Sequence, residues 1–428
     1  MIAFKNDMQF AYLFENFVWA TYGSPWMQYS ALGKMGPLPL AAARAFSQSV
    51  FGKHHHRCDI EREGQVTYGA TVRELSLELG QVGQPGSESL IVPIMILLMH
   101  ASTIPDPQAA FFHAKGLMKA MQICGPARFS KVPLRYAFKS CRATLFTIAL
   151  IARQRTFLEL PEWRTIPWSE IGCTKTPQNE LVDILVFVPG LISDAAQFES
   201  GIYSGTATDI VKNVKAQLEI LYQWRQDWSS RNPSGAYELS PSQVPNSQAR
   251  LGQHRVFRKV LCFSSFTAAT EICLYVPLPT VRLLLSPLTP SRYNAVLLLL
   301  LGILYQFQPP PQSPPISSPS TPLPTTPLLL PSSISTLHSP AIEILRIFES
   351  QMLSIPSSSN PSSALFWLLP LGLAHKVLED EPDYCRWIKG MLETSKVTRG
   401  YGTGNNEYGF GSYKFPKMGR EGVRKGMK

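Results

Sequence analysis

Large apolar side chains recur along this chain every three or four residues, and that spacing constrains its fold more than any other feature. Side chains separated by three or four positions lie on one face of an α-helix. The longest such stripe, within residues 208–230, consists of Ile210, Val214, Leu218, Leu221, Trp224 and Trp228. Because alternating strand patterns and hairpin signals are scarce, we predict an all-α protein, built as a large helical bundle or array.

Prolines, glycines and capping residues divide the rest of the pattern into further helices, because proline favours the first helical turn and glycine follows the last. The predicted segments are residues 107–124, residues 134–160, a helix starting with the capping-box pattern Thr71 to Glu74, one after Ser339-Pro340 and a short one after Pro382. Core packing is the expected role of each apolar face.

The composition supports a large core. Of the 428 residues, 45% are hydrophobic and 16% charged, which excludes a chain that is disordered throughout. The longest apolar runs, Leu90 to Met99 and Ala295 to Tyr305, are shorter than the ~20 residues of a membrane span, so we predict buried helices and no membrane segment. Asp7 lies early and no clean apolar run with a cleavage site follows Met1, so no secretory signal is expected.

The cysteines argue against a disulfide scaffold, since their number is odd, their spacing is irregular and no C-x-x-C occurs. They are Cys58, Cys124, Cys141, Cys173, Cys262, Cys273 and Cys385. Reduced thiols in a nuclear or cytosolic compartment are the simpler interpretation.

Composition changes sharply in two places. Between residues 308 and 340, 11 of 33 residues are proline and eight are serine, which predicts a disordered insert, with a polyproline II ligand as the alternative. The last residues are rich in glycine, tyrosine and bases, and we expect them to be mobile. The predicted organisation is a helical domain over 1–307, the insert over 308–340, further helices of the same domain over 341–395, and a basic tail over 396–428.

The formal net charge of +10 is concentrated near the end of the chain, because residues 389–428 carry +6 of it. The nearly neutral remainder is not predicted to bind nucleic acid. Aromatic residues among the tail's bases are compatible with stacking on single-stranded nucleic acid, and a nuclear-import patch is an equal alternative. A solvated tail is the preferred interpretation.

Candidate chemical groups are few. The only dense cluster of ligand-type residues is His54, His55 and His56 with Cys58 and Asp59 close by. Adjacent histidines on one element point in different directions, so a zinc site would need donors from elsewhere. We prefer a polar helix end with one buried histidine to a metal site.

Other candidates lack the partners or the context that their chemistry requires. We expect His113 to be a satisfied core histidine, because no carboxylate or nucleophile can be assigned to it as a general base. Trp163 and Trp168 are expected to be packing anchors, and a ligand-pocket wall is the alternative. In the segment Gly201 to Gly205 the serine, Ser204, lies one place late for a nucleophile elbow, and the glycine-rich segment 400–404 does not follow a strand. We therefore predict no catalytic, cofactor-binding or metal-binding residues.

Several segments in order resemble the regulatory region of fungal binuclear zinc-cluster transcription factors. These segments are Leu13 to Trp26, Ala43 to Phe46, Phe51 to His55, Ile60 to Gly64, Tyr68-Gly69, Leu97 to Ala101, Leu160 to Trp163 with Pro167-Trp168, Leu365 to Leu371, and Trp387 through Glu393 to Arg399. The resemblance implies a helical regulatory domain, a nuclear location and a role in RNA polymerase II transcription. In that family the regulatory region modulates activity, in some members through small metabolites.

The chain departs from that family at the DNA-reading module. The family reads DNA through six cysteines that hold two zinc ions, and this sequence has no counterpart of them. We expect a non-enzymatic transcription regulator that contacts the transcription machinery or a dimer partner, and binds DNA only weakly or indirectly. The alternatives are a small-metabolite-binding helical module, or a truncated gene model of a complete zinc-cluster factor.

Overall fold

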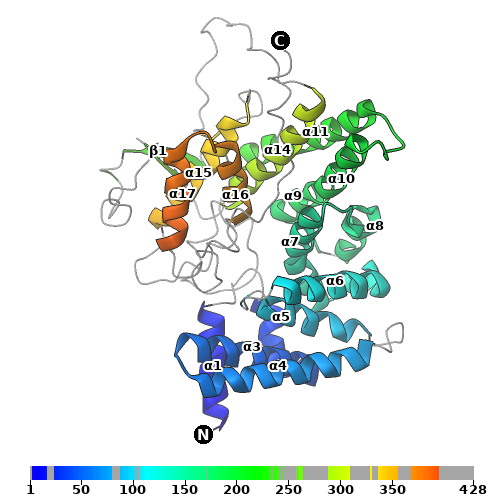
Figure 1. Ribbon diagram of the computed structural model, residues 1–428, viewed down its shortest axis with the longest axis vertical. Coiled ribbons are helices and arrows are strands. Elements are labelled where there is room, and N and C mark those ends of the chain that lie inside the picture. The colour runs from blue at the N-terminus through cyan, green and yellow to red at the C-terminus, as the bar shows by residue number, and fades with distance from the viewer. Residues whose placement is uncertain are drawn as a thin grey trace, which may run out of the picture. The chain divides into compact units, whose positions relative to one another are not determined.

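The computed structural model confirms the all-α prediction and divides the chain into two compact units (Figure 1). Up to residue 399, the first unit consists of Met1–Ile148 and Phe157–Thr174, and the second of Ala149–Thr156 and Lys175–Arg399. The residues that the structure describes are 2–16, 24–79, 87–101, 103, 107–170, 172–232, 235–240, 243, 257, 259–263, 288–308, 328–329, 336–354 and 368–394. The predicted tail over 396–428 and most of the predicted insert over 308–340 lie outside them.

The first unit is built from α-helices joined by short turns and 3₁₀ helices. Its helices are α1 (Ile2–Asn16), α2 (Ser24–Ala31), α3 (Pro37–His54), α4 (Cys58–Leu79), α5 (Ile91–Ala101), α6 (Pro107–Cys124), α7 (Leu134–Ala152) and α8 (Pro161–Thr165), with 3₁₀ turns η1 (Ser87–Leu90), η2 (Pro126–Ser130), η3 (Phe157–Glu159) and η4 (Ile166–Trp168). Helix α5 is apolar on all sides and is buried against α3 and α6, as its sequence predicts.

Aromatic side chains fill the core between η2, α7 and α8. Trp163 is 4% exposed and lies with its ring centroid 4.6 Å from that of Phe157 and 5.6 Å from that of Phe129. Trp168 is also buried, with its ring 5.5 Å from that of Phe138. The prediction that the two tryptophans are packing anchors is therefore confirmed.

The second unit is organised around one central helix. Residues 293–301 of α14 are all buried, because α9, α10, α11, α15 and α16 all pack on this helix. All six residues of the predicted 208–230 stripe are buried on α11, which a capping box between Thr206 and Asp209 begins. The helices of this unit are α9 (Pro177–Leu185), α10 (Val188–Glu199), α11 (Ala207–Arg231), α14 (Leu288–Phe307), α15 (His338–Ser354), α16 (Leu368–Val377) and α17 (Pro382–Thr394).

A short antiparallel ribbon accompanies these helices and was not predicted. Strand β1 (Ala236–Leu239) pairs with β2 (Val260–Phe263), so that Ala236 lies opposite Phe263. The carboxylate of Glu238 accepts from Arg346 of α15 and from Lys259, which attaches the ribbon to the helical core. The two strands are only four residues long and 20 residues apart, so no local pattern announces them.

Two helix boundaries differ from those predicted. The capping-box prediction at Thr71 is wrong, because Thr71 lies inside α4 and its hydroxyl donates to the carbonyl of Thr67 at 2.7 Å. The helix predicted over 134–160 ends at Ala152, because Arg153 adopts a left-handed conformation with φ 51°. The amide of Gln154 then donates to the carbonyl of Ala149 at 3.0 Å, which is the pattern of a Schellman cap without its usual glycine.

Within the described residues, one stretch is long and apolar enough to cross a membrane by length and composition. It is Pro177–Glu199, and 67% of its most apolar window is buried inside the structure. It comprises two helices, α9 and α10, that pack on α11 and α14. The two runs predicted to be buried helices lie in α5 and α14, and both are buried.

Candidate functional site

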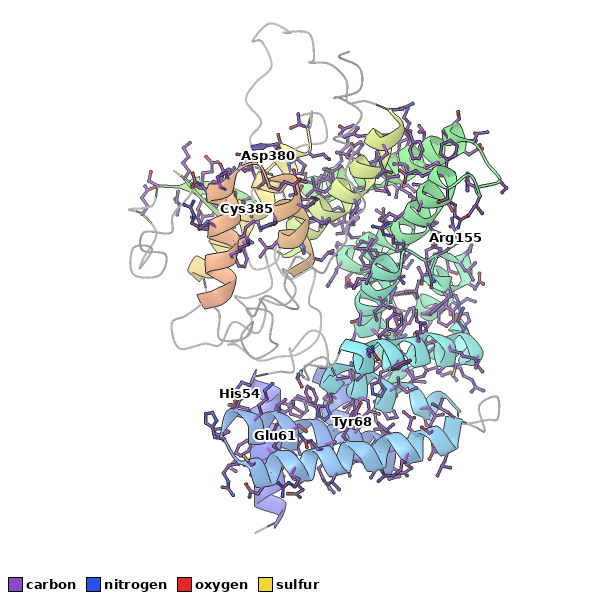
Figure 2. The ribbon with its side chains drawn as sticks, in the orientation of Figure 1. His54, Glu61, Tyr68, Arg155, Asp380 and Cys385 are labelled. Carbon is purple, nitrogen blue, oxygen red and sulfur yellow. The ribbon has the colours of Figure 1, made fainter. Side chains whose placement is uncertain are left out.

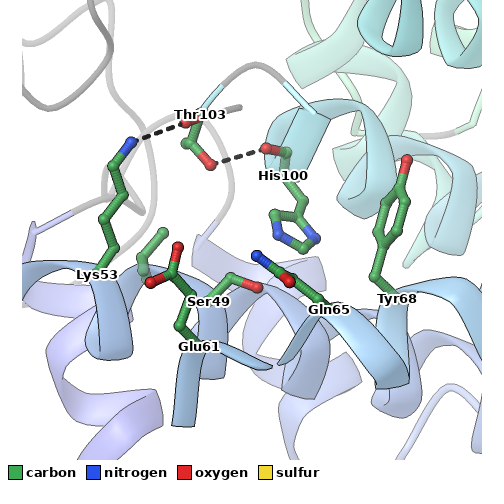
Figure 3. Close-up of a pocket in the computed structure, with 8 residues that line it drawn as sticks. Ser49, Lys53, Glu61, Gln65, Tyr68, His100 and Thr103 are labelled. Carbon is green, nitrogen blue, oxygen red and sulfur yellow. Dashed lines mark hydrogen bonds between the residues drawn. The ribbon is translucent and has the colours of Figure 1, made fainter. Parts of the chain in front are cut away.

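Three helices of the first unit line a cavity of about 250 Å³ that opens to solvent (Figure 3). Its walls come from α3, α4 and the end of α5 and combine apolar, aromatic and charged groups. The lining residues are Ser49, Val50, Lys53, Glu61, Gln65, Tyr68, His100 and Thr103. Figure 2 places Glu61 and Tyr68 along α4, with His54 near the end of α3.

Two glycines bring α3 and α4 close together beside this cavity. A Cβ atom on Gly52 would lie 2.4 Å from the backbone nitrogen of Glu61, and one on Gly64 would lie 2.6 Å from Ser49 Oγ. Such distances are far below van der Waals contact, so only glycine permits this approach of the two helices. The close antiparallel packing puts Ser49 and Lys53 of α3 on the same cavity as Glu61 of α4.

The His100 side chain is the most deeply buried polar group of the cavity wall, with 1% of the residue exposed. Its ring stacks on Phe46 at 5.5 Å and meets the edge of Tyr68 at 4.9 Å. Burial, with a smaller effect of His113, lowers the pKa of His100 to about 4, so the imidazole is neutral at pH 7. Among the described residues, no group hydrogen bonds to its buried Nδ1 atom.

A hydrogen bond between helices fixes the aromatic wall. The hydroxyl of Tyr68 on α4 lies 2.6 Å from Nε2 of His113 on α6. Burial lowers the pKa of His113, which favours the neutral ring, whose Nε2 atom can accept a hydrogen bond from the Tyr68 hydroxyl. His113 is thus hydrogen-bonded as predicted, but it is half-buried and does not lie in the core.

Two opposite charges line the same cavity without forming a salt bridge to each other. Lys53 Nζ donates to the carbonyl oxygen of Thr103 at 3.3 Å and is otherwise exposed. In the described part of the chain, the Glu61 carboxylate forms no hydrogen bond and no salt bridge. The cavity therefore offers one ammonium group and one carboxylate, with a neutral imidazole and a phenol ring on its other side.

The histidine cluster at residues 54–56 forms a polar helix end, but none of its three histidines is buried, contrary to expectation. The φ of 53° at His56 ends α3, and the amide of Arg57 donates to the carbonyl of Gly52 at 2.8 Å. Asp59 pairs with Arg57 at 2.7 Å, which lowers the pKa of its carboxyl to about 2. In the described ranges, no group of three or more histidine, cysteine or acidic residues is arranged to hold a metal ion.

The remaining sequence candidates do not gather at the cavity. Trp163 and Trp168 lie in the aromatic core around η2, α7 and α8. Ser204 is exposed on the loop between α10 and α11, where Gly201 has a φ of 70°. The segment 400–404 and the bases of the tail lie outside the described residues.

His100, Lys53 and Glu61 were not predicted to be members of one site. Each lies in a segment that carries the resemblance, within 51–55, 60–64 or 97–101, so their positions were noted but their meeting was not. The signal that was available is the pair Gly52 and Gly64, because glycines inside two successive helices indicate a close approach of backbones.

The second unit contains a buried polar cluster that the sequence did not reveal. Glu343 of α15 is 3% exposed and accepts from Asn294 Nδ2 at 2.9 Å and from the amide of Leu329. The buried Arg225 guanidinium lies over the rings of Trp228 at 5.1 Å and Tyr293 at 5.9 Å. Burial raises the pKa of Glu343 and lowers that of Arg225, while the charge of each opposes the shift of the other.

The fold and the cavity define an all-α protein of two helical units, with a polar-lined cavity in the first. Comparison with models of protein families, with curated proteins and with solved structures finds no match. These comparisons therefore assign the chain to no family, and its resemblance to the zinc-cluster family stays a prediction.

Proposed function

We propose that this protein is a nuclear, non-enzymatic regulator of RNA polymerase II transcription that acts through protein contacts of its helical units. The observation that supports this most is the convergence of the segments that carry the resemblance. Segments 51–55, 60–64, 68–69 and 97–101 together supply four of the eight residues around one cavity, Lys53, Glu61, Tyr68 and His100. An ordered set of motifs that packs into one site argues for a common origin with the regulatory region of that family.

The surface of the first unit offers groups suited to protein contacts. Val66 and Leu77 on α4 are 66% and 76% exposed, and Phe112 and Ile123 on α6 are 67% and 47% exposed. Each pair is eleven residues apart, which is about three helical turns, so its members share a face. A partner protein that packs along such a face would cover both side chains of the pair and remove their apolar surface from water.

A tethered reporter tests the proposal directly. The whole chain is fused to an unrelated DNA-binding module whose sites lie upstream of a reporter gene, and transcript is compared with that from the module alone. A change in either direction of at least severalfold is expected, because a regulator brought to a promoter alters transcription without its own DNA reader. An expressed, nuclear fusion that leaves the transcript level unchanged would contradict the proposal.

Gel-shift titrations at rising salt test the role assigned to DNA. We expect binding that fades as salt rises and shows no sequence preference, because only the basic residues near the end of the chain would supply phosphate contacts. A preference for one sequence that survives moderate salt would oppose the assignment of weak or indirect binding.

A further inference from the structure

We propose that the cavity between α3, α4 and α5 is a binding site for a small zwitterion, of the class of free amino acids with a polar side chain. The inference concerns the cavity alone and stands whether or not the chain acts in transcription. Charge, hydrogen bonding and size each support it from separate observations.

The charges of the wall match a ligand that carries both signs. Lys53 supplies an ammonium group held near Thr103 by a 3.3 Å hydrogen bond, and Glu61 supplies a carboxylate that pairs with no described residue. A purely anionic ligand would be repelled by the Glu61 carboxylate, and a purely cationic ligand would be repelled by the Lys53 ammonium group. A zwitterion satisfies both groups at once, with its carboxylate toward Lys53 and its ammonium toward Glu61.

The cavity wall also contains two hydrogen-bonding groups that no described residue satisfies. His100 is 1% exposed, its imidazole points into the space framed by Ser49, Gln65 and Tyr68, and its Nδ1 atom has no partner (Figure 3). The buried Ser49 Oγ atom is likewise without a partner among the described residues. Burying such groups costs free energy unless a ligand or water satisfies them.

A neutral imidazole both donates and accepts, and so does a serine hydroxyl. The matching ligand group is one that also does both, such as a side-chain carboxamide. The rings of Tyr68 and His100 and the Val50 side chain supply apolar contact for the methylene groups between the two polar ends.

The volume sets the size of the ligand. A cavity of about 250 Å³ has room for about eight water molecules at ~30 Å³ each. It is smaller than the ~300–1,000 Å³ of sites for drug-sized molecules. A free amino acid such as asparagine or glutamine, with about as many non-hydrogen atoms as the cavity holds waters, fits this space.

The test is calorimetric titration and thermal unfolding of the full chain with each of the twenty free L-amino acids. We expect stabilisation by asparagine or glutamine, and no stabilisation by the N-acetyl derivative or the methyl ester of the same compound. Each derivative removes one charge from the ligand and leaves the protein unchanged. If no free amino acid binds at millimolar concentration, or if both derivatives bind as tightly as the parent, the proposal is wrong.

Protein variants then assign the contacts. Lys53→Met and Glu61→Gln should each weaken binding of the amino acid by about tenfold or more, because each removes a hydrogen bond to a charged group. The matched controls are Lys119→Met on α6 and Glu78→Gln on α4, two exposed positions outside the cavity, and binding should be unchanged in both. Undiminished affinity in both Lys53→Met and Glu61→Gln would place the ligand elsewhere and overturn the assignment.

Discussion

At the scale of single residues, His100 illustrates how burial sets a protonation state. Its ring lies between Phe46 and Tyr68, and burial lowers its pKa to about 4. A histidine in an unfolded chain has a pKa near 6.5, so the unfolded state binds more protons between these two values. Stability supplied by the neutral ring is therefore present above pH 6.5 and is lost as pH falls toward 4.

This difference predicts a pH effect that one substitution removes. Between pH 7 and pH 4, His100 should account for a loss of about 3 kcal/mol in the free energy of unfolding of the first unit. His100→Leu conserves volume approximately and cannot be protonated, so its loss over the same range should be smaller by about that amount. Urea unfolding at each pH, followed by proteolysis resolved to peptides of the first unit, measures it. Equal losses in both proteins would show that His100 does not titrate as argued.

Glu343 gives a second prediction at this scale. Removing its carboxylate in Glu343→Leu leaves Asn294 Nδ2 and the amide of Leu329 without their acceptor, and removes a negative charge that acts on the buried Arg225. We expect the second unit to lose about 3 kcal/mol of stability, because each buried donor left without an acceptor costs ~1–3 kcal/mol. The double variant with Arg225→Met should be more stable than Glu343→Leu alone. A double variant with the summed loss of both singles would refute coupling between the two charges.

At the scale of elements, the approach of α3 and α4 depends on Gly64. A Cβ atom at this position would meet the backbone nitrogen of Ser49 at 2.7 Å, so Gly64→Ala should cost about 1–3 kcal/mol. Gly69→Ala on the same helix meets only the far end of Arg73 at 3.9 Å and should stabilise by about 0.5–1 kcal/mol. Thermal unfolding of the two variants checks this, and similar shifts in both would contradict the packing described.

The sequence predicted elements well where local chemistry determines them. α6 and α15 follow the predicted helix starts closely because Pro107 and Pro340 give local signals, and α11 contains the whole predicted stripe of residues 208–230. The end of α7 was missed, since Arg153 takes a left-handed φ usually reserved for glycine. The β1–β2 ribbon was missed because its pairing joins distant residues.

The cavity could not be predicted from the sequence, because residues of separate helices meet there only through tertiary packing. Its residues lie on three helices, and their meeting depends on how those helices pack. The glycines at 52 and 64 determine that packing, but a glycine in a helix does not say which backbone approaches it. The histidine cluster at 54–56 is recognisable from its composition, whereas His100 lies alone in an apolar helix and no neighbour in the sequence marks it as part of a site.

At the scale of the whole molecule, the described chain consists of two helical units with different kinds of interior. The first contains a cavity bounded by opposite charges, and the described part of the second contains a core around α14 and a buried polar cluster. In neither unit does the proposed function require chemistry by the chain itself. If the chain instead regulates transcription through protein contacts, the transcript level should depend on exposed apolar side chains of a folded unit.

The measurement that tests this most directly is the tethered reporter carried out with surface variants. Val66→Ser with Leu77→Ser changes only exposed positions of α4, and Leu32→Ser, at a position 68% exposed outside α4 and α6, is the control. With thermal unfolding unchanged in both, we predict that the α4 variant loses most of the reporter effect and that the control retains it. A full effect in the α4 variant, and in the equivalent Phe112→Ser and Ile123→Ser variant of α6, would contradict regulation through these contacts.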